Sequence, residues 1–392
     1  MSDSRYRRVE ADIDLDAIRY NIETVQKLNS PEKETLLVIK ADAYGHGAVA
    51  VAREMDDLAD YFAVATVEEA VELRQNDIVK PILILGYTDE SEYDAVIDYD
   101  ITTAVYDFDR AEALSDLALK KGKKAKVHIK VDSGMSRIGF QCEEEGVDEA
   151  LRLTELPGLE IEGIFTHYAK ADYKDKSDAM VQYGRFKWFV NQLEAEGVEF
   201  KIRHIDNSAG SMEIHSSGFD MMRLGIVIYG LYPSEEIDKS VMLKPAMSLK
   251  ARVIHVKELP AGRGIGYGWT YITEKPTKVA TVSAGYADGY PRALSEKGRV
   301  LIHGQYAPIL GRVCMDQVMV DVTDIDKPDD EVVVGDEAVL FGRQGDNLIS
   351  VEEVAEPANS FNYEEVCNIS RRVPRVYQKD GREVYTVDYL MK

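Results

Sequence analysis

Residues 36–86, LLVIKADAYGHGAVAVAREMDDLADYFAVATVEEAVELRQNDIVKPILILG, carry the pattern that decides the fold. Three short apolar runs, 36–41, 61–66 and 81–86, are separated by longer amphipathic stretches. In the stretch that starts at Thr66, apolar residues recur at intervals of three and four, which is the helical period. This part of the chain is therefore predicted to alternate between strands and helices.

The same alternation continues to about residue 230. Five more apolar runs follow, and the stretches that start at Arg110, Glu143 and Arg185 have helical periodicity. Alternating strands and helices imply parallel strands joined by right-handed crossovers. Eight such units in this length predict a (β/α)8 barrel of the TIM type, with a doubly wound open sheet as the alternative. The five further runs are 101–107, 126–132, 161–167, 202–206 and one within 219–229.

The pattern changes after about residue 240. From there the chain contains alternating strand-like segments separated by Gly, Asp or Pro turns, and helical pattern is sparse until residue 351. We therefore expect a barrel domain over residues 12–240 and a mostly β domain over residues 241–392. The N-terminal strand, residues 1–11, is assigned to the second domain.

Composition excludes several classes of function. The chain has 392 residues, 45% of them hydrophobic and 30% charged, as in a folded globular protein. Its net charge of −23 argues against binding to nucleic acid or to an anionic membrane surface. No signal peptide and no membrane-spanning run is predicted. Cys142, Cys314 and Cys367 show no metal-binding or disulfide spacing, so we expect a cytoplasmic protein without a metal site.

Polar residues close or follow five of the eight predicted barrel strands, and in such barrels this end carries the functional groups. A lysine at the end of an apolar strand can form a Schiff base or act as a base, although it can also simply reach solvent. Loops after the last two strands often bind phosphate. No single residue in this set identifies a reaction. The set is Lys40, Lys130, Arg137, His167, Asn207, Ser208, Arg223 and Gly225.

Taken together, the segments resemble the alanine racemases, two-domain enzymes of fold type III that use pyridoxal 5'-phosphate. The resemblance covers nearly the whole chain, and VIKADAYGHGA, around Lys40, is specific for the family's cofactor lysine. The other motifs occur in the family's order: VDSGMSRIGF, DNSAG, MMRLGIVIYG, GYGWTY, SAGYADGYPR, GRVCMDQVMVDV and FNYEEV.

The resemblance implies a two-base racemisation. Lys40 would bind the cofactor covalently and act as the base on one face of the substrate, and Tyr267 of the partner subunit would act on the other. Arg223 would face the pyridine nitrogen, with His167 between it and Tyr267. A cationic network of Arg223 and His167 would make the tyrosine a better base at neutral pH. The cofactor phosphate would be held by Tyr44, Ser208, Gly225, Ile226 and Tyr363.

The resemblance also implies how the substrate is bound. Arg137 would contact the cofactor and the substrate carboxylate, and the backbone at Met315 of the partner would help to bind that carboxylate. Lys130 occupies a position that is often carbamylated and then orients Arg137. A shared site of this kind implies a homodimer. The entry corridor would be lined by Asp172, Tyr286, Arg292, Arg312 and Phe361.

The implied function is the racemisation of alanine, which supplies D-alanine for peptidoglycan. A serine or broad-specificity racemase is the alternative within the family, since an apolar pocket discriminates only modestly against one extra small group. A carrier that binds pyridoxal phosphate without catalysis is a more distant alternative. A decarboxylase of the same fold type is disfavoured, because such enzymes present a carboxylate to the pyridine nitrogen where this chain has Arg223.

Overall fold

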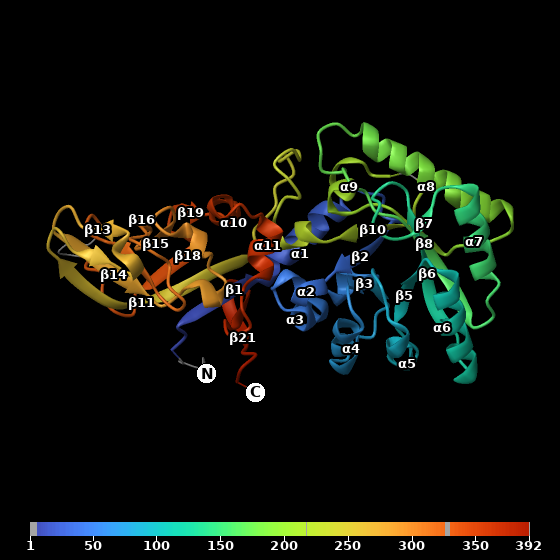
Figure 1. Ribbon diagram of the computed structural model, residues 1–392, viewed down its shortest axis with the longest axis horizontal. Coiled ribbons are helices and arrows are strands. Elements are labelled where there is room, and N and C mark those ends of the chain that lie inside the picture. The colour runs from blue at the N-terminus through green and yellow to red at the C-terminus, as the bar shows by residue number, and fades with distance from the viewer. Residues whose placement is uncertain (1–5, 217, 326–329, 392) are drawn as a thin grey trace. The chain divides into compact units, whose positions relative to one another are not determined.

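The computed structural model describes residues 6–216, 218–325 and 330–391 (Figure 1). The chain forms two compact units. One, the barrel unit, is Ile18–Lys244, and the other, the β unit, combines the chain up to Ala17 with Pro245–Lys392. Within the described ranges, no helix has both the length and the apolar character needed to cross a bilayer.

The barrel unit contains a closed ring of eight parallel strands. The strand order is β5-β4-β3-β2-β10-β9-β8-β6, and pairing of β5 with β6 closes the ring. The predicted TIM-type barrel is confirmed, and the open sheet is excluded. The strands are β2 (Glu34–Val38), β3 (Tyr61–Val64), β4 (Ile82–Ile84), β5 (Thr102–Val105), β6 (Ala125–Asp132), β8 (Leu159–Phe165), β9 (Ile202–His204) and β10 (Met221–Leu224).

Helices connect these strands, as the amphipathic stretches predict. Helix α4 (Val67–Gln75) begins with a capping box, in which Thr66 and Glu69 each accept the other's backbone N–H. Helix α8 (Ser177–Ala195) begins eight residues before the predicted start at Arg185. Its first turns expose Met180 and Val181, which interrupts the apolar periodicity. The others are α1 (Leu15–Gln26), α3 (Ala48–Glu54), α5 (Tyr93–Asp98), α6 (Phe108–Lys120), α7 (Glu144–Thr154) and α9 (Ser208–Glu213).

The β unit is built on a mixed sheet, which confirms a mostly β second domain. Its N-terminal strand β1 (Val9–Asp14) pairs antiparallel with β11 (Met247–Leu259) and parallel with β20 (Arg375–Lys379). The chain's first strand thus belongs to the sheet formed by its last segments. The remaining strands of this sheet are β14 (Thr277–Val282), β15 (Arg299–Ile302), β16 (Gln305–Pro308), β17 (Val318–Asp321), β18 (Glu337–Gln344), β19 (Asn347–Ile349) and β21 (Arg382–Val387).

Candidate functional site

Lys40 stands at the start of an unusual backbone turn at the carboxyl end of β2. The four residues Ala41–Tyr44, none of them glycine, have φ angles between 52° and 54°, in the left-handed region. This conformation costs an L-residue roughly 1–2 kcal/mol each. Strain of this kind persists only where the surrounding structure imposes it, and it concentrates at functional sites.

Hydrogen bonds from neighbouring elements impose the turn. The Glu69 carboxylate, at the start of α4, accepts the backbone N–H of Ala41 at 2.6 Å and that of Ala65 at 2.8 Å. The Asp42 carboxylate accepts the N–H of Ala48 at 2.8 Å, which ties the turn to α3. The backbone that carries Lys40 is therefore fixed at the barrel mouth.

A small cradle for an anion lies at the ends of β9 and β10. The backbone N–H of Gly225 donates to Ser208 Oγ at 3.0 Å, and Ser208 is the first residue of α9. A Cβ at residue 225 would lie 3.0 Å from the Tyr44 hydroxyl and 3.6 Å from Ser208 Oγ, so glycine keeps this space open. Ile226 starts the next helical turn, Ile226–Tyr229. Hydroxyls and helix N-termini that converge in this way suit a phosphate group.

The cradle is braced by aromatic packing on the turn. The rings of Tyr44 and Tyr229 lie 5.1 Å apart, and the His46 ring stacks on Tyr229 at 4.3 Å. The Tyr229 hydroxyl donates to the carbonyl of Val38 at 3.0 Å, which links the cradle to the last residue of β2. Tyr44, Ser208 and Gly225, predicted as phosphate ligands, are thus brought together next to the segment that carries Lys40.

Arg223 lies buried at the end of β10 and donates to several neighbours. Its Nη2 donates to the carbonyls of Thr166 and Ile205 at 2.8 and 3.0 Å and lies 3.1 Å from His167 Nδ1. Its Nη1 lies 3.0 Å from His204 Nδ1. Burial lowers the pKa of Arg223 to about 10, which still leaves it cationic at neutral pH.

The cationic network expected of Arg223 and His167 takes its charge from Arg223. Burial, together with the charge of Arg223, holds the pKa of His167 well below its usual value, so the ring is neutral. An arginine only donates hydrogen bonds, so Nδ1 of His167 is the acceptor and the ring proton sits on Nε2. His167 offers a hydrogen-bond donor, and the positive charge belongs to Arg223 alone.

Lys130 is a buried lysine in β6, only 3% exposed. Its Nζ donates to the carbonyls of Val131 at 2.6 Å and Ile138 at 3.2 Å. Burial, with the nearby charge of Arg223, lowers the pKa of Lys130 to about 7. A large fraction of this amine is therefore unprotonated, and nucleophilic, near neutral pH.

The exposed residue Arg137 lies on a loop organised by Asp132, which the sequence reasoning missed. The Asp132 carboxylate accepts the backbone N–H groups of all four residues 134–137, at 2.9–3.0 Å. Burial opposes ionisation of Asp132, but these donors outweigh it and hold its pKa below the usual value. The signal was available, because an aspartate followed by Ser-Gly at a strand end is typical of such turns.

The other predicted residues belong mainly to the β unit. Tyr267 starts the helical turn Tyr267–Trp269 and is 71% exposed, and Met315 is exposed on a nearby loop. Both line one cavity of about 760 Å³ in this unit, together with Ile265 and Met319. Arg312 lies beside the turn, since a Cβ at residue 268 would be 3.5 Å from its Cζ. The turn, the cavity and Met315 thus form one exposed surface.

The remaining predicted residues lie on loops or at helix ends. Tyr363 is in α11 (Asn362–Cys367), and its ring lies 5.3 Å from that of the exposed residue Phe361. Arg292 is exposed in a short helical turn. Asp172, in the barrel unit, is half-buried, and its carbonyl accepts the Ser234 hydroxyl at 2.8 Å.

A buried aspartate anchors the loops that carry Tyr286 and Met315, and the sequence reasoning missed it. Asp288 is fully buried, forms ion pairs with Arg8 and Arg372, and accepts the N–H of Gly285 at 2.9 Å. Next to it, the N–H of Tyr286 donates to the Cys314 carbonyl at 3.0 Å, which joins the two loops. The motif SAGYADGYPR contains this residue, but nothing in its pattern separates a buried aspartate from a turn aspartate.

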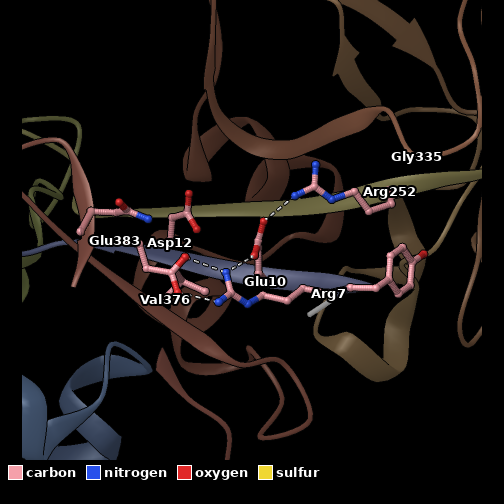
Figure 2. A pocket seen from close by; sticks show the side chains of 9 residues that line it. Arg7, Glu10, Asp12, Arg252, Gly335, Val376 and Glu383 are labelled. Carbon is pink, nitrogen blue, oxygen red and sulfur yellow. Dashed lines mark hydrogen bonds and ion pairs between the residues drawn. The ribbon is translucent and has the colours of Figure 1, made fainter. Parts of the chain in front are cut away.

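Figure 2 shows a polar pocket of about 340 Å³ in the β unit, beside β1. In it, Glu10 accepts hydrogen bonds from Arg7 at 3.3 Å and from Arg252 at 2.9 Å. Arg7 also pairs with Glu383 at 2.6 Å. Because these charges compensate one another, we assign the pocket to fastening β1 rather than to ligand binding.

Comparisons with known proteins agree along the whole chain. The family described as "Alanine racemase, N-terminal domain" matches residues 13–233, and "Alanine racemase, C-terminal domain" matches residues 246–377. Alanine racemase of Desulforamulus reducens is 48% identical over 94% of this chain and 98% of its own length. A solved alanine racemase of Clostridium difficile 630 superimposes with a TM-score of 0.94 at 42% identity, covering 99% of this chain and 100% of its own. A structure of an alanine racemase from that organism in complex with cycloserine gives a TM-score of 0.92 at 40% identity, with 99% and 100% coverage.

Proposed function

Since this chain belongs to the alanine racemase family and is an isomerase acting on alanine, we propose that it interconverts L- and D-alanine with pyridoxal 5'-phosphate and two bases. One observation carries the proposal. Lys40, on its strained turn, the cradle of Tyr44, Ser208 and Gly225, and the pair Arg223–His167 all lie at the carboxyl end of one barrel, where such folds place their active sites.

The residues present fit the proposed cofactor. Gly225 keeps open a space edged by two hydroxyls, which suits the phosphate, and Ile226 and Tyr363 would complete its binding. Lys40 would hold the aldehyde end through its amine. Arg223 would face the ring nitrogen as a cation that donates but does not accept a proton. When bound, the cofactor supplies an electron sink for the charge that develops at the substrate Cα.

Two side chains would handle the substrate proton. Racemisation removes the Cα proton from one face and returns a proton to the other, so bases on opposite faces avoid a swing of a single base. Lys40 would serve one face, and Tyr267 of the partner subunit the other. His167, neutral and with its proton on Nε2, would donate to the Tyr267 oxygen, with the charge of Arg223 behind it. The high exposure of Tyr267 supports a role in another subunit.

Substrate binding would use the loop that Asp132 shapes. Arg137 on this loop would bind the substrate carboxylate together with the partner's Met315 backbone. Lys130, carbamylated, would orient Arg137. We propose that Asp172 faces an entry corridor whose other residues come from the partner subunit, namely Tyr286, Arg292, Arg312 and Phe361. We also propose that the D-alanine formed serves peptidoglycan synthesis. The relative bound to cycloserine supports a small molecule as ligand.

One NMR experiment tests the reaction and the substrate together. The purified protein with pyridoxal phosphate is incubated in heavy water with L-alanine, L-serine or L-lysine, and loss of the Cα proton and chirality are followed. We expect alanine to exchange and racemise while the other two stay inert. Equal rates with serine would make this a broad-specificity racemase. Cofactor binding without any exchange would contradict racemisation and favour a carrier.

A further inference from the structure

The interior of this barrel contains a line of polar side chains. Barrels of this type are usually filled by Val, Ile and Leu. Here Glu162 (β8), His128 (β6), His204 (β9) and Arg223 (β10) are all buried, the two histidines completely. Strand register orders them. His128 is level with residue 163, His204 is level with residues 165 and 221, and Arg223 lies two residues further along β10. The line therefore climbs from Glu162 to Arg223, toward the carboxyl end.

Each member is linked to the next. Arg223 Nη1 lies 3.0 Å from His204 Nδ1, and His204 Nε2 lies 2.9 Å from His128 Nδ1. His128 Nε2 lies 3.5 Å from Glu162 Oε2, farther than the two links before it, and among the described residues it has no other hydrogen-bond partner. The four residues come from four different strands, so the line connects half of the barrel.

The direction of the hydrogen bonds is fixed from both ends. Arg223 only donates, so His204 accepts at Nδ1 and carries its proton on Nε2. That proton points to Nδ1 of His128, which must accept it and therefore carries its own proton on Nε2, facing Glu162. An ionised carboxylate only accepts, so the far end agrees with the near end. This arrangement gives each of the three contacts a donor and an acceptor, and the contact of His128 with Glu162 is the longest, at 3.5 Å.

The charges are consistent with this arrangement. Burial lowers the pKa of both His128 and His204, so both rings are neutral. Burial alone would raise the pKa of Glu162, but the neighbouring groups His128 and Tyr61 outweigh it and lower the pKa. A buried cation and a buried anion are thus joined by two neutral, oriented rings.

The fold reserves room for this line. A Cβ at Gly163 would lie 2.8 Å from the His128 ring and 2.7 Å from the Ile202 carbonyl, so a larger residue there would displace the imidazole. The Phe165 ring stacks on His204 with centroids 4.8 Å apart and planes 9° from parallel. Packing therefore holds each imidazole in the orientation that the hydrogen bonds require.

We propose that Glu162, through His128 and His204, is a positioning residue that fixes the orientation of Arg223 for the racemisation. The proposal rests on the proposed function. Arg223 donates to His167 as well, so a fixed Arg223 also fixes the ring that would serve Tyr267. Glu162 touches neither substrate nor cofactor. Its effect would reach the site only along the chain Glu162–His128–His204–Arg223.

The first test reads the rings directly. In the holoenzyme labelled with 15N-histidine, and again after the cofactor is removed, NMR distinguishes protonated from unprotonated ring nitrogens. His128→Gln and His204→Gln variants assign the signals. We expect both rings to be neutral with the proton on Nε2 in both states. A protonated ring, or a proton on Nδ1 of either ring, would overturn the proposal. This readout does not depend on activity.

The second test compares Glu162→Gln with Glu160→Gln, which makes the same charge change on the same strand at a more exposed carboxylate paired with Lys201. We expect Glu162→Gln to scramble the His128 tautomer and to lower kcat roughly 10-fold with little change in KM, as for groups that act through a directly bound residue. The Glu160→Gln variant should match the wild type. If Glu162→Gln does not fold, the tautomers of His128 and His204 in the wild-type protein still test the proposal.

The outcomes separate this proposal from the proposed function. A wild-type protein that does not racemise alanine contradicts the function, whatever the tautomers are. A wild-type racemase in which Glu162→Gln keeps both the His128 tautomer and full kcat contradicts the positioning role alone. Combining Glu162→Gln with His128→Gln should cost no more than either change by itself, because both break one chain.

Discussion

Lys130 is the residue whose chemistry depends most on its surroundings. Its pKa of about 7 means that the unprotonated amine increases as pH rises through neutrality. An unprotonated amine adds carbon dioxide to form a carbamate. We expect protein equilibrated with 13C-bicarbonate to show a carbamate signal in 13C NMR that grows from below pH 7 to above it.

The control for this prediction is Lys130→Arg, which keeps a positive charge but forms no such carbamate. It should lose the signal, and its KM for alanine should rise as Arg137 loses its orienting neighbour. Lys201, 66% exposed at its side chain, is an internal comparison that should give no buried carbamate signal. A spectrum unchanged in Lys130→Arg would place the carbamate elsewhere.

The charge of His167 could not be predicted from the sequence. Its position at the end of a predicted strand was readable, and so was its family role. Its charge depends on burial and on Arg223, Arg137, Lys130 and Lys40, which four different strands and loops bring near it. No local pattern encodes such a sum. The sequence therefore predicts a cationic network of Arg223 and His167, and only the structure assigns the charge of that network to Arg223.

The turn after β2 stores strain that substitution can measure. Ala41 is exposed and left-handed, with φ of 53°. Glycine adopts this conformation freely, so Ala41→Gly should raise the free energy of unfolding by up to about 1 kcal/mol. Ala113 in the middle of α6 provides a matched control. There, Ala113→Gly should lower the free energy of unfolding by about 1 kcal/mol. Urea denaturation measures the free energy of unfolding of both variants. A change of the same sign in both would contradict strain at Ala41.

Asp288 anchors two loops of the β unit, and its removal should be costly. It is fully buried against Arg8 and Arg372, so Asp288→Asn leaves cationic groups without their carboxylate. The side chains of Arg8 and Arg372 are 36% and 29% exposed, so water partly compensates their charge and the cost is about 1–3 kcal/mol. We expect a loss of that order in the free energy of unfolding and a higher KM, because Met315 loses its support.

The comparison for this prediction is Asp316→Asn. Asp316 pairs with the same Arg372, at 2.5 Å, but its side chain is 53% exposed. An exposed pair contributes about 1 kcal/mol or less. Chemical denaturation of both variants should therefore separate burial from pairing. Equal losses in the free energy of unfolding would mean that the burial of Asp288 does not add to the stabilisation from its ion pairs.

At the level of elements, periodicity recovered most of the fold. All eight apolar runs became barrel strands, because a strand buried on both sides needs continuous apolar residues. The sequence did not predict the start of α8, because the exposed Met180 and Val181 break the apolar period. It did not predict the left-handed turn either, because residues 41–44, ADAY, contain no glycine. The line Glu162–His128–His204 also escaped, because it joins residues that lie far apart in sequence.

For the whole molecule, the prediction concerns the exposed apolar surface of the β unit. Tyr267, Trp269 and Met315 are exposed on the β unit, and Tyr267 and Met315 line its cavity of about 760 Å³. Exposed apolar patches of this kind mark interaction surfaces. In a two-fold dimer, each such surface would meet the partner, and two equal sites would form.

Mixing two inactive variants tests this arrangement. Lys40→Ala removes one base and Tyr267→Phe the other, so each homodimer should be inactive. A heterodimer contains one site with both defects and one intact site. After subunit exchange, which is demonstrated by mass spectrometry, about half the activity per heterodimer should return. Mixtures before exchange serve as the control. Exchange without any recovery would mean that Lys40 and Tyr267 act within one chain, and the shared site would have to be abandoned.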